Sequence, residues 1–305
     1  MTMKSRITKK KPGAPKATLV KRDKTSPAIK VAGLGAAVCA GVTFRGVTFK
    51  KPTPIKAPIG GYVAGCDYVV TITRGKPAAL PMASDSIPAN AIGGFHFAPG
   101  GNAFGITGGD STPAINPYSA WDRNFRPACA DPRGMTLVDV PSEGRIWFDI
   151  YLLGKDHLES GTSRHGATIA DGTDLPQNPA GGYFPRFDYE AACAVMKHHG
   201  KQLLGAEEFF AAAYGVTEKT AAPTEPKTTG LDAQRTSRWG LMQATGNMWV
   251  WGTDGHPTVP RPSIFGGSWL VGVPAGSRYA SLDYWPAGSS GGIGARGRSD
   301  HLQLG

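Results

Sequence analysis

The sequence contains few cysteines, and they follow no pattern typical of a metal or redox site. Cys39, Cys66, Cys129 and Cys193 include no pair with C-x-x-C spacing, so a zinc or disulfide-exchange motif is not indicated. A disulfide framework is typical of much shorter secreted chains. We therefore expect free thiols, mostly buried as small apolar groups.

Signals for membrane insertion, secretion and common catalytic machinery are also missing. No apolar run approaches the length of a membrane span, and the first twenty residues hold several lysines but no apolar stretch typical of a signal peptide. Neither Gly100-Gly101 nor residues 288–294 are followed by Gly-Lys-Ser/Thr, so a phosphate-binding loop is not predicted. No Ser-His-Asp arrangement is indicated. The expectation is a chain without catalytic residues or a cofactor.

Metal ligation is not predicted either. Asp171 and Asp174 resemble a fragment of a calcium loop, but the twelve-residue spacing and the closing Glu are absent. The adjacent His198 and His199 would face different ways on a helix, so they make a poor chelating pair. Gly200 directly follows them, which favours a helix C-terminus at this point.

Turn-forming residues and an uneven charge are what the sequence does provide. Its 42 Gly and 25 Pro favour strands and long loops over a helical bundle. Residues 1–56 carry 14 Lys and Arg against Asp23 alone, so the formal charge of +10 comes from this end of the chain. The first thirty residues are rich in Lys, Pro and Thr and cannot bury enough surface to order alone.

These shifts in composition divide the chain into three segments. Residues 1–30 are predicted to be a basic tail, or an arm that binds nucleic acid or an acidic partner. Residues 31–126 read as a β-rich region, with a strand over 67–73. Residues 127–305 are predicted to be α+β. Their expected strands cover 135–140, 146–153, 239–251 and 265–269, and their expected helices cover 187–198, capped by Asp188, and 206–214.

The last forty-two residues, 264–305, contain two kinds of position. Some hold residues typical of a rigid scaffold, and between them lie positions whose side chains share neither size nor polarity. Neither the strand period nor the helix period is present, and a rigid frame that carries unrelated side chains is typical of a binding surface. The predicted frame residues are Trp269, Arg278, Pro286 and Arg296. The two arginines are expected to donate paired hydrogen bonds to backbone carbonyls or to an acid such as Asp300. The predicted contact residues are Ser268, Leu270, Val271, Gly272, Pro274, Ser281, Asp283, Tyr284, Gly288, Ser290, Gly292 and Ile293.

This segment resembles the variable region of proteins diversified by retroelements, and in particular the tropism determinants of phages. The similarity extends in order over about residues 90–305. It includes AIGGFHFAPGGN, GGDSTPAINPYSAWD, RPACADPRGMTLV, DIYLLGKDHLESGTSRHGATIADG, MKHHGKQLL and GNMWVWG. The resemblance implies a C-type lectin fold, in the variant shared with formylglycine-generating enzymes. It also implies that mutagenesis directed at adenines replaces residues at the twelve predicted contact positions. This process cannot produce Lys, Glu, Gln, Met or Trp, and none of these five residue types occurs at the twelve positions.

The same resemblance implies a receptor-binding protein. It would lie at the tip of a phage tail fibre, or it would belong to a bacterial cell that carries a prophage. It would act as a homotrimer in host adsorption, with a bacterial surface protein as the receptor class and no cofactor. Two alternatives remain. A formylglycine-generating-type oxidase would need a reactive cysteine pair near the C-terminus, yet no cysteine follows Cys193. A structural virion protein associated with nucleic acid would act through the basic N-terminal arm.

Overall fold

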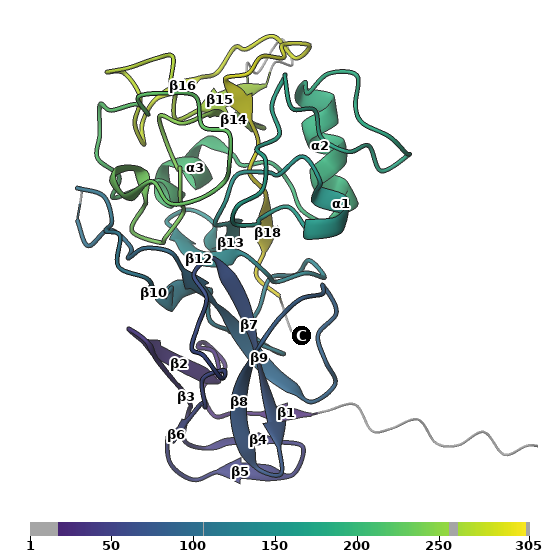
Figure 1. Ribbon diagram of the computed structural model, residues 1–305, viewed down its shortest axis with the longest axis vertical. Coiled ribbons are helices and arrows are strands. Elements are labelled where there is room, and N and C mark those ends of the chain that lie inside the picture. The colour runs from purple at the N-terminus through teal and green to yellow at the C-terminus, as the bar shows by residue number, and fades with distance from the viewer. Residues whose placement is uncertain (1–17, 106, 256–261, 303–305) are drawn as a thin grey trace, which may run out of the picture.

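The computed structural model describes residues 18–105, 107–255 and 262–302, and it is elongated, with its helices gathered at one end (Figure 1). The other end consists of β-strands. These strands are β1 (Leu19–Val20), β2 (Ile29–Ala32), β3 (Gly35–Val38), β4 (Val42–Phe44), β5 (Val47–Phe49), β6 (Thr53–Pro54), β7 (Cys66–Thr73), β8 (Lys76–Pro81), β9 (Ala91–Ala98), β10 (Ala114–Ile115) and β11 (Trp121–Asp122).

Three sheets build the strand-rich end. The largest has the order β10-β9-β7-β8, with β11 also paired to β9, and two three-stranded sheets have the orders β1-β4-β5 and β2-β3-β6. The strand expected over 67–73 is confirmed as β7, whose β-branched and aromatic residues suit a buried strand. Every residue of β9 is also buried. A shared core that includes Phe44, Tyr68 and Phe95 joins the three sheets.

The helix-bearing end is α+β, as expected from the sequence. Its elements are β12 (Met135–Val140), β13 (Gly144–Asp149), α1 (His157–Ser160), α2 (Tyr189–His198), α3 (Ala206–Ala212), β14 (Trp249–Gly252), β15 (Ser263–Phe265), β16 (Ala280–Ser281), β17 (Ile293–Gly294) and β18 (Arg298–Asp300). Two short 3-10 helices are η1 (Pro117–Ser119) and η2 (Ala233–Arg235). One sheet has the order β12-β13-β18 and the other β16-β15-β14-β17.

Helix α2 begins and ends where its sequence signals predict. The Asp188 side chain accepts a hydrogen bond from the backbone N–H of Ala191 at 3.0 Å, which caps the first turn. At the other end Gly200 has a φ of +65°, and the N–H of Lys201 donates to the carbonyl of Met196 at 2.9 Å. The helix therefore closes through a left-handed glycine, as expected.

Three expected strands of the helix-bearing end are wrong in extent. Of residues 239–251, only the final part is a strand, β14, since left-handed backbone at Gly240, Gln243 and Gly246 interrupts the rest. The strand expected over 265–269 is instead β15, which ends at Phe265 because the next two residues, both glycine, turn the chain. Strand β13 starts and ends earlier than the predicted 146–153.

Buried contacts join the two ends of the molecule. Val69 and Ala91 of the large sheet share a core with Met135 and Trp147 of the β12–β13 pair. The Asp67 carboxylate also accepts a hydrogen bond from the N–H of Gly134 at 2.9 Å. The large sheet is therefore packed directly against the elements that carry the C-terminal loops.

Candidate functional site

Two loops of the C-terminal segment lie at the far end of the molecule, beside β14, β15 and β16 (Figure 1). The first loop, residues 266–279, follows β15 through Gly266 and Gly267, whose φ angles are +87° and +77°. A Cβ atom on Gly267 would lie 2.9 Å from the Cβ of Ala275. Only glycine fits this turn, so the sequence fixes the point at which the loop leaves the sheet.

Main-chain hydrogen bonds hold the first loop in place. The N–H of Gly266 donates to the carbonyl of Tyr279 at 2.7 Å, and the N–H of Gly276 donates back to the carbonyl of Gly266 at 3.1 Å. Within the loop, the N–H of Val271 donates to the carbonyl of Ser268 at 3.0 Å. Such bonds involve only backbone atoms, so they do not depend on which side chains the loop carries at its non-glycine positions.

A carboxylate outside the segment fastens the loop from the side. Glu218, on the loop that follows α3, accepts hydrogen bonds from the Ser277 N–H at 2.9 Å and from the Ser277 hydroxyl. A Cβ atom on Gly276 would lie only 2.1 Å from the Glu218 carboxylate. Glycine at this position therefore lets the two loops approach.

The second loop, residues 282–292, is attached to three neighbouring segments. The N–H of Tyr284 donates to the carbonyl of Pro262 at 3.0 Å, and the carbonyl of Ser290 accepts from the N–H of Gly172 at 3.0 Å. The carbonyl of Pro286 accepts from the first N–H of α2 at 3.1 Å. Pro286 thus contributes to the frame through its backbone.

Arg296 anchors the end of the segment as the sequence predicts. Its guanidinium is fully buried and donates to the carbonyls of Asp149 and Ile150, each at 2.6 Å, and of Met242 at 2.7 Å. Burial lowers the pKa of Arg296 to about 10, and nearby Asp149 opposes this shift. The side chain remains charged at neutral pH and joins three separate segments.

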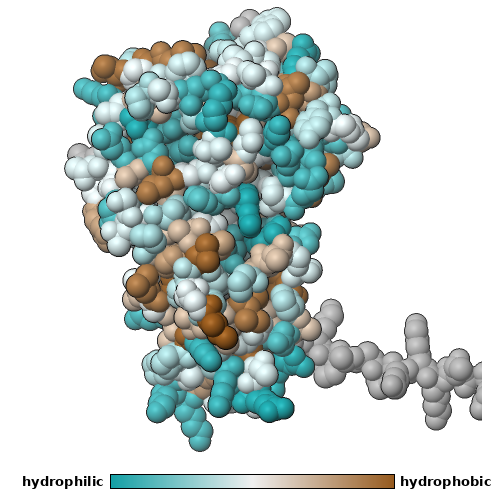
Figure 2. Space-filling view, in the orientation of Figure 1, coloured by the Kyte–Doolittle hydropathy of each residue, from teal (hydrophilic) through white to brown (hydrophobic). Residues whose placement is uncertain are grey.

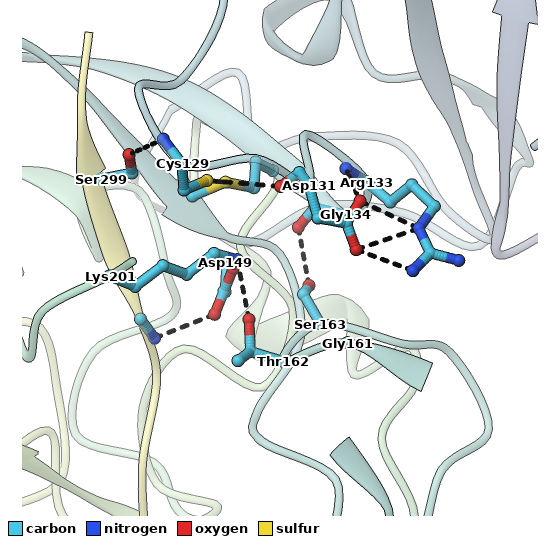
Figure 3. A network of polar contacts seen from close by, with 12 residues as sticks. Cys129, Asp131, Arg133, Gly134, Asp149, Gly161, Thr162, Ser163, Lys201 and Ser299 are labelled. Atoms are coloured by element: carbon cyan, nitrogen blue, oxygen red, sulfur yellow. Dashed lines mark hydrogen bonds and ion pairs between the residues drawn. The ribbon is translucent and has the colours of Figure 1, made fainter. Parts of the chain in front are cut away.

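Asp149 and Lys201 form a buried ion pair beside this anchor (Figure 3). The Lys201 Nζ lies 2.5 Å from Asp149 Oδ1 and 2.7 Å from the hydroxyl of Thr162. The second carboxylate oxygen of Asp149 accepts from the N–H of Gly297 at 3.0 Å. Lys201 follows α2 and Gly297 precedes β18, so the pair holds the helix end and the last strand on β13.

The twelve predicted contact residues do not all face solvent. Four are exposed: Leu270, Pro274, Asp283 and Ser290. Five are half-buried: Val271, Gly272, Ser281, Tyr284 and Gly288. The remaining three are buried: Ser268, Gly292 and Ile293. Leu270 is the most open of the large side chains predicted, with 67% of its surface exposed.

The prediction of an outward-pointing side chain is wrong at the three buried positions. Ile293 is 2% exposed and packs in the core with Trp251 and Ile264, because β17 pairs in parallel with the central strand β14. Ser268 is also 2% exposed, and a Cβ atom on Gly292 would lie 3.3 Å from the Ser268 hydroxyl. These residues belong to the support beneath the loops.

One predicted frame residue has a different role from the one expected. Arg278 is exposed, and its guanidinium lies 5.3 Å from the centre of the Phe210 ring rather than on backbone carbonyls. Trp269 is half-buried against the core of Met248 and Val250, in agreement with a frame role. The backbone N–H of Trp269 donates to the carbonyl of Asn247 at 3.0 Å.

Three apolar residues on the same two loops were missed by the sequence analysis. Val273 is 70% exposed, Trp285 is 60% exposed and Leu282 is 51% exposed. Figure 2 shows apolar patches between hydrophilic ones at this end of the molecule. The sequence did contain a signal for these residues. Large apolar side chains stand in loops that are rich in Gly and Ser and show neither a strand nor a helix period, and exposed apolar side chains of this kind favour a contact role.

The other candidate sites of the sequence take structural roles. Asp171 Oδ1 accepts hydrogen bonds from the N–H groups of Thr173 at 2.5 Å and Asp174 at 2.7 Å, which makes a local turn. His199 contacts His157, and burial lowers the pKa of His199 to about 3. Among the described residues, no three His, Cys, Asp or Glu side chains are grouped as metal ligands.

The cysteines are free, as expected, although only Cys129 is fully buried and the other three are half-buried. Burial raises the pKa of the Cys129 and Cys193 thiols, which disfavours the reactive thiolate. Across the described ranges, no helix is both long enough and apolar enough to cross a membrane.

Comparison with known proteins gives relatives that match nearly the whole chain, although no family model matches the sequence. The tail fibre receptor-binding protein of Bordetella phage BPP-1 is 38% identical over an alignment of 338 positions, gaps included, which covers 95% of this chain and 86% of that protein. The solved structure of the U1 variant of the major tropism determinant has a TM-score of 0.86 at 36% identity. The P3c variant has a TM-score of 0.85 at 37% identity, and both alignments cover 95% of this chain and 87% of the other. The chain therefore has the C-type lectin fold of the tropism determinants and belongs to the family of phage tail fibre receptor-binding proteins.

Proposed function

We propose that this chain is a host-recognition protein of a phage or prophage, and that it binds its receptor through the two C-terminal loops. The observation that carries the proposal is the contrast between backbone and side chains in these loops. Their main chain is fixed by hydrogen bonds, whereas Leu270, Val273 and Trp285 expose most of their apolar surface. Apolar side chains on a rigid base bind partners with little loss of conformational entropy.

The proposed contact set comprises the nine predicted positions that are exposed or half-buried, together with Val273, Leu282 and Trp285. Tyr284 belongs both to the supporting frame and to the contact surface. Its ring packs edge-on against Trp251, with 5.6 Å between the ring centres, while part of the side chain stays open to solvent. The buried Ser268, Gly292 and Ile293 would influence binding only by shaping the loops. Replacement at the open positions is the mode of diversification that a retroelement would exploit.

The assembly and the location follow from the same proposal. We propose a homotrimer at the tip of a tail fibre, with residues 31–126 as the assembly region and residues 127–305 as the lectin domain. Several copies of one weak site would raise the overall affinity for a cell surface. The variant of the lectin fold shared with formylglycine-generating enzymes is supported by two motifs, GNMWVW at residues 246–251 and GGSW at residues 266–269. Main-chain hydrogen bonds join them, from the N–H of Gly246 to the carbonyl of Gly266 at 3.1 Å and from the backbone N–H of Trp269 to the carbonyl of Asn247 at 3.0 Å. We propose binding alone for this chain, without catalysis, a cofactor or membrane insertion.

The direct test is adsorption of the purified chain to cells of the bacterial strain that the phage infects. Replacing Leu270 by aspartate places a charge on the most open apolar side chain of the predicted set. We expect cell binding to fall at least about tenfold, as for a contact at the centre of an interface. Pretreating the cells with protease should abolish binding if the receptor is a surface protein.

Leu158 provides the control for this experiment. It is 41% exposed on α1, outside both C-terminal loops and outside the proposed assembly region. Leu158→Asp is expected to leave adsorption unchanged. Equal losses for the two variants, or no loss for Leu270→Asp and Trp285→Ala together, would contradict the assignment of the binding surface.

A further inference from the structure

Two hairpins at the strand-rich end are closed by the same unusual turn. Arg45-Gly46 joins β4 to β5 and Arg74-Gly75 joins β7 to β8, each as a two-residue loop. The φ angles are +50° and +81° in the first turn and +49° and +76° in the second. Positive φ at both positions defines the type I′ hairpin turn.

Arginine is an unexpected choice at the first position of such a turn. Type I′ turns strongly favour Asn, Asp or Gly there, since other residues adopt a left-handed backbone at a cost. Both hairpins have arginine instead, so local backbone preference does not explain the residue. Strained positions of this kind are concentrated at sites of function, and an external role for the two guanidinium groups would account for them.

The fold brings the two turns together. A Cβ atom on Gly75 would lie 3.8 Å from a methyl group of Val47, which directly follows the Arg45-Gly46 turn. Figure 1 shows β4, β5 and β8 at the lower end of the molecule, opposite β14, β15 and β16. Arg123 also lies close by, with its guanidinium 5.8 Å from the centre of the Phe44 ring. Burial lowers the pKa of Arg123, and Arg126 and Arg45 lower it further.

Among the described residues of this end of the molecule, exposed basic side chains outnumber exposed acidic ones. Over residues 18–82, the exposed basic side chains are Arg22, Lys24, Lys30, Arg45, Lys50, Lys51, Lys56, Arg74 and Lys76. Asp23 is the one exposed acid in that range, and its carboxylate accepts hydrogen bonds from Thr25. No described carboxylate forms an ion pair with either turn arginine. The sequence before residue 18 adds six Lys and Arg and no acid.

We propose that the twin Arg-Gly turns form a docking surface for an acidic segment of a partner protein. A guanidinium fork matches the geometry of a carboxylate and can bind it through two hydrogen bonds. Leu80 is 49% exposed on the same face of β8 as Lys76, which adds apolar contact beside the charges.

A single-stranded nucleic acid is a poorer match to this surface, and duplex DNA is the alternative that the test below decides. Proteins that bind single strands stack bases on aromatic side chains, whereas the large apolar side chains exposed over residues 18–82 are the aliphatic Val20, Leu34, Ile59, Val63 and Leu80. Docking at this end leaves the C-terminal loops free, and the inference does not depend on what those loops bind. In a homotrimer assembled through residues 31–126, the two turns must lie outside the contact between copies, so a changed oligomeric state in the Arg45→Asn or Arg74→Asn variant would contradict the docking role.

The test compares two polyanions on the full chain. Binding of poly-L-glutamate, and of duplex DNA at equal charge concentration, is measured by fluorescence anisotropy over a range of salt. The variants are Arg45→Asn, Arg74→Asn and the double replacement, which keep the turns because asparagine is preferred there. The midpoint of thermal unfolding is expected to stay unchanged or rise, so a loss of binding cannot be attributed to unfolding.

Lys219 supplies the matched control. It is exposed and has a φ of +59°, but it lies on the loop beside Gly276 near the opposite end of the molecule. Lys219→Asn therefore removes one charge from a left-handed position elsewhere. We expect each arginine variant to weaken poly-L-glutamate binding at least fivefold, the double variant further, and Lys219→Asn less than twofold. Equal losses for all single variants, no binding of poly-L-glutamate, or tighter turn-dependent binding of DNA would overturn the proposal.

Discussion

Replacing Arg296 by methionine is expected to lower the free energy of unfolding by about 3–5 kcal/mol, the cost typical of breaking a buried charged network. The guanidinium is fully buried, and its hydrogen bonds reach carbonyls on β13, on the residue after β13 and on the segment before β14. Methionine fills a similar volume but leaves these carbonyls without donors. Each unsatisfied buried group costs about 1–3 kcal/mol. Urea denaturation followed by tryptophan fluorescence measures the change.

Arg278 is the control for this prediction, since it belongs to the same segment but is exposed over the ring of Phe210. An exposed cation–π contact contributes about 0.5–1 kcal/mol, so Arg278→Met should cost no more than that. Lysine at position 296 should recover only part of the loss, because an ammonium lacks the planar fork. A loss below about 1 kcal/mol for Arg296→Met would mean that the carbonyls find other donors and that Arg296 is not an anchor.

Replacing Lys201 by methionine is expected to cost about 3–5 kcal/mol as well, because it leaves the Asp149 carboxylate buried without its cation. Neither side chain has more than 4% of its surface exposed. Burial alone would lower the pKa of Lys201, but the contact with Asp149 reverses the shift, and the pKa is raised. A raised lysine pKa contributes stability that is present at neutral pH and is lost only as pH rises through the folded-state value.

A double-mutant cycle separates the ion pair from the packing around it. Asp149→Asn keeps an acceptor for the N–H of Gly297 and removes the negative charge. The double variant Asp149→Asn with Lys201→Met should therefore be clearly more stable than Lys201→Met alone, with a coupling energy of about 1–3 kcal/mol. Additive losses in the cycle would show that the two charges do not interact and that Lys201 acts only through its hydrocarbon stem.

Local sequence signals were sufficient to predict an element where local residues determine its bounds. Asp188 and Gly200 mark the two ends of α2, and the apolar and β-branched residues among 135–140 mark β12. The same reasoning failed for residues 239–248, which are largely buried without forming a strand. Gln243 adopts a φ of +52° there, a conformation set by tertiary contacts that local propensity does not encode.

The candidate site shows the same division. The glycine turn at residues 266–267 was predictable, because it depends on the intrinsic geometry of one residue type. The anchor at Arg296 was predicted as well, but the same reasoning failed for Arg278, so the sequence alone does not show which arginine is buried. The burial of Ile293 was not predictable, since it results from the parallel pairing of β17 with β14, two strands between which β15, β16 and three connecting segments intervene in the sequence. Exposure of Val273 and Trp285 was predictable in principle, because both are large apolar residues in loops rich in Gly and Ser.

The central claim is that exposed side chains on the C-terminal loops can be exchanged without disturbing the lectin scaffold. The most direct measurement is the free energy of unfolding for substitutions at Leu270 and Ser290, compared with Ile293→Ala. Exchanges at the two exposed positions should stay within about 0.5 kcal/mol of the parent chain, whereas Ile293→Ala should cost about 2–5 kcal/mol. If Leu270 and Ser290 prove as costly to replace as Ile293, the loops are part of the core and the account is wrong.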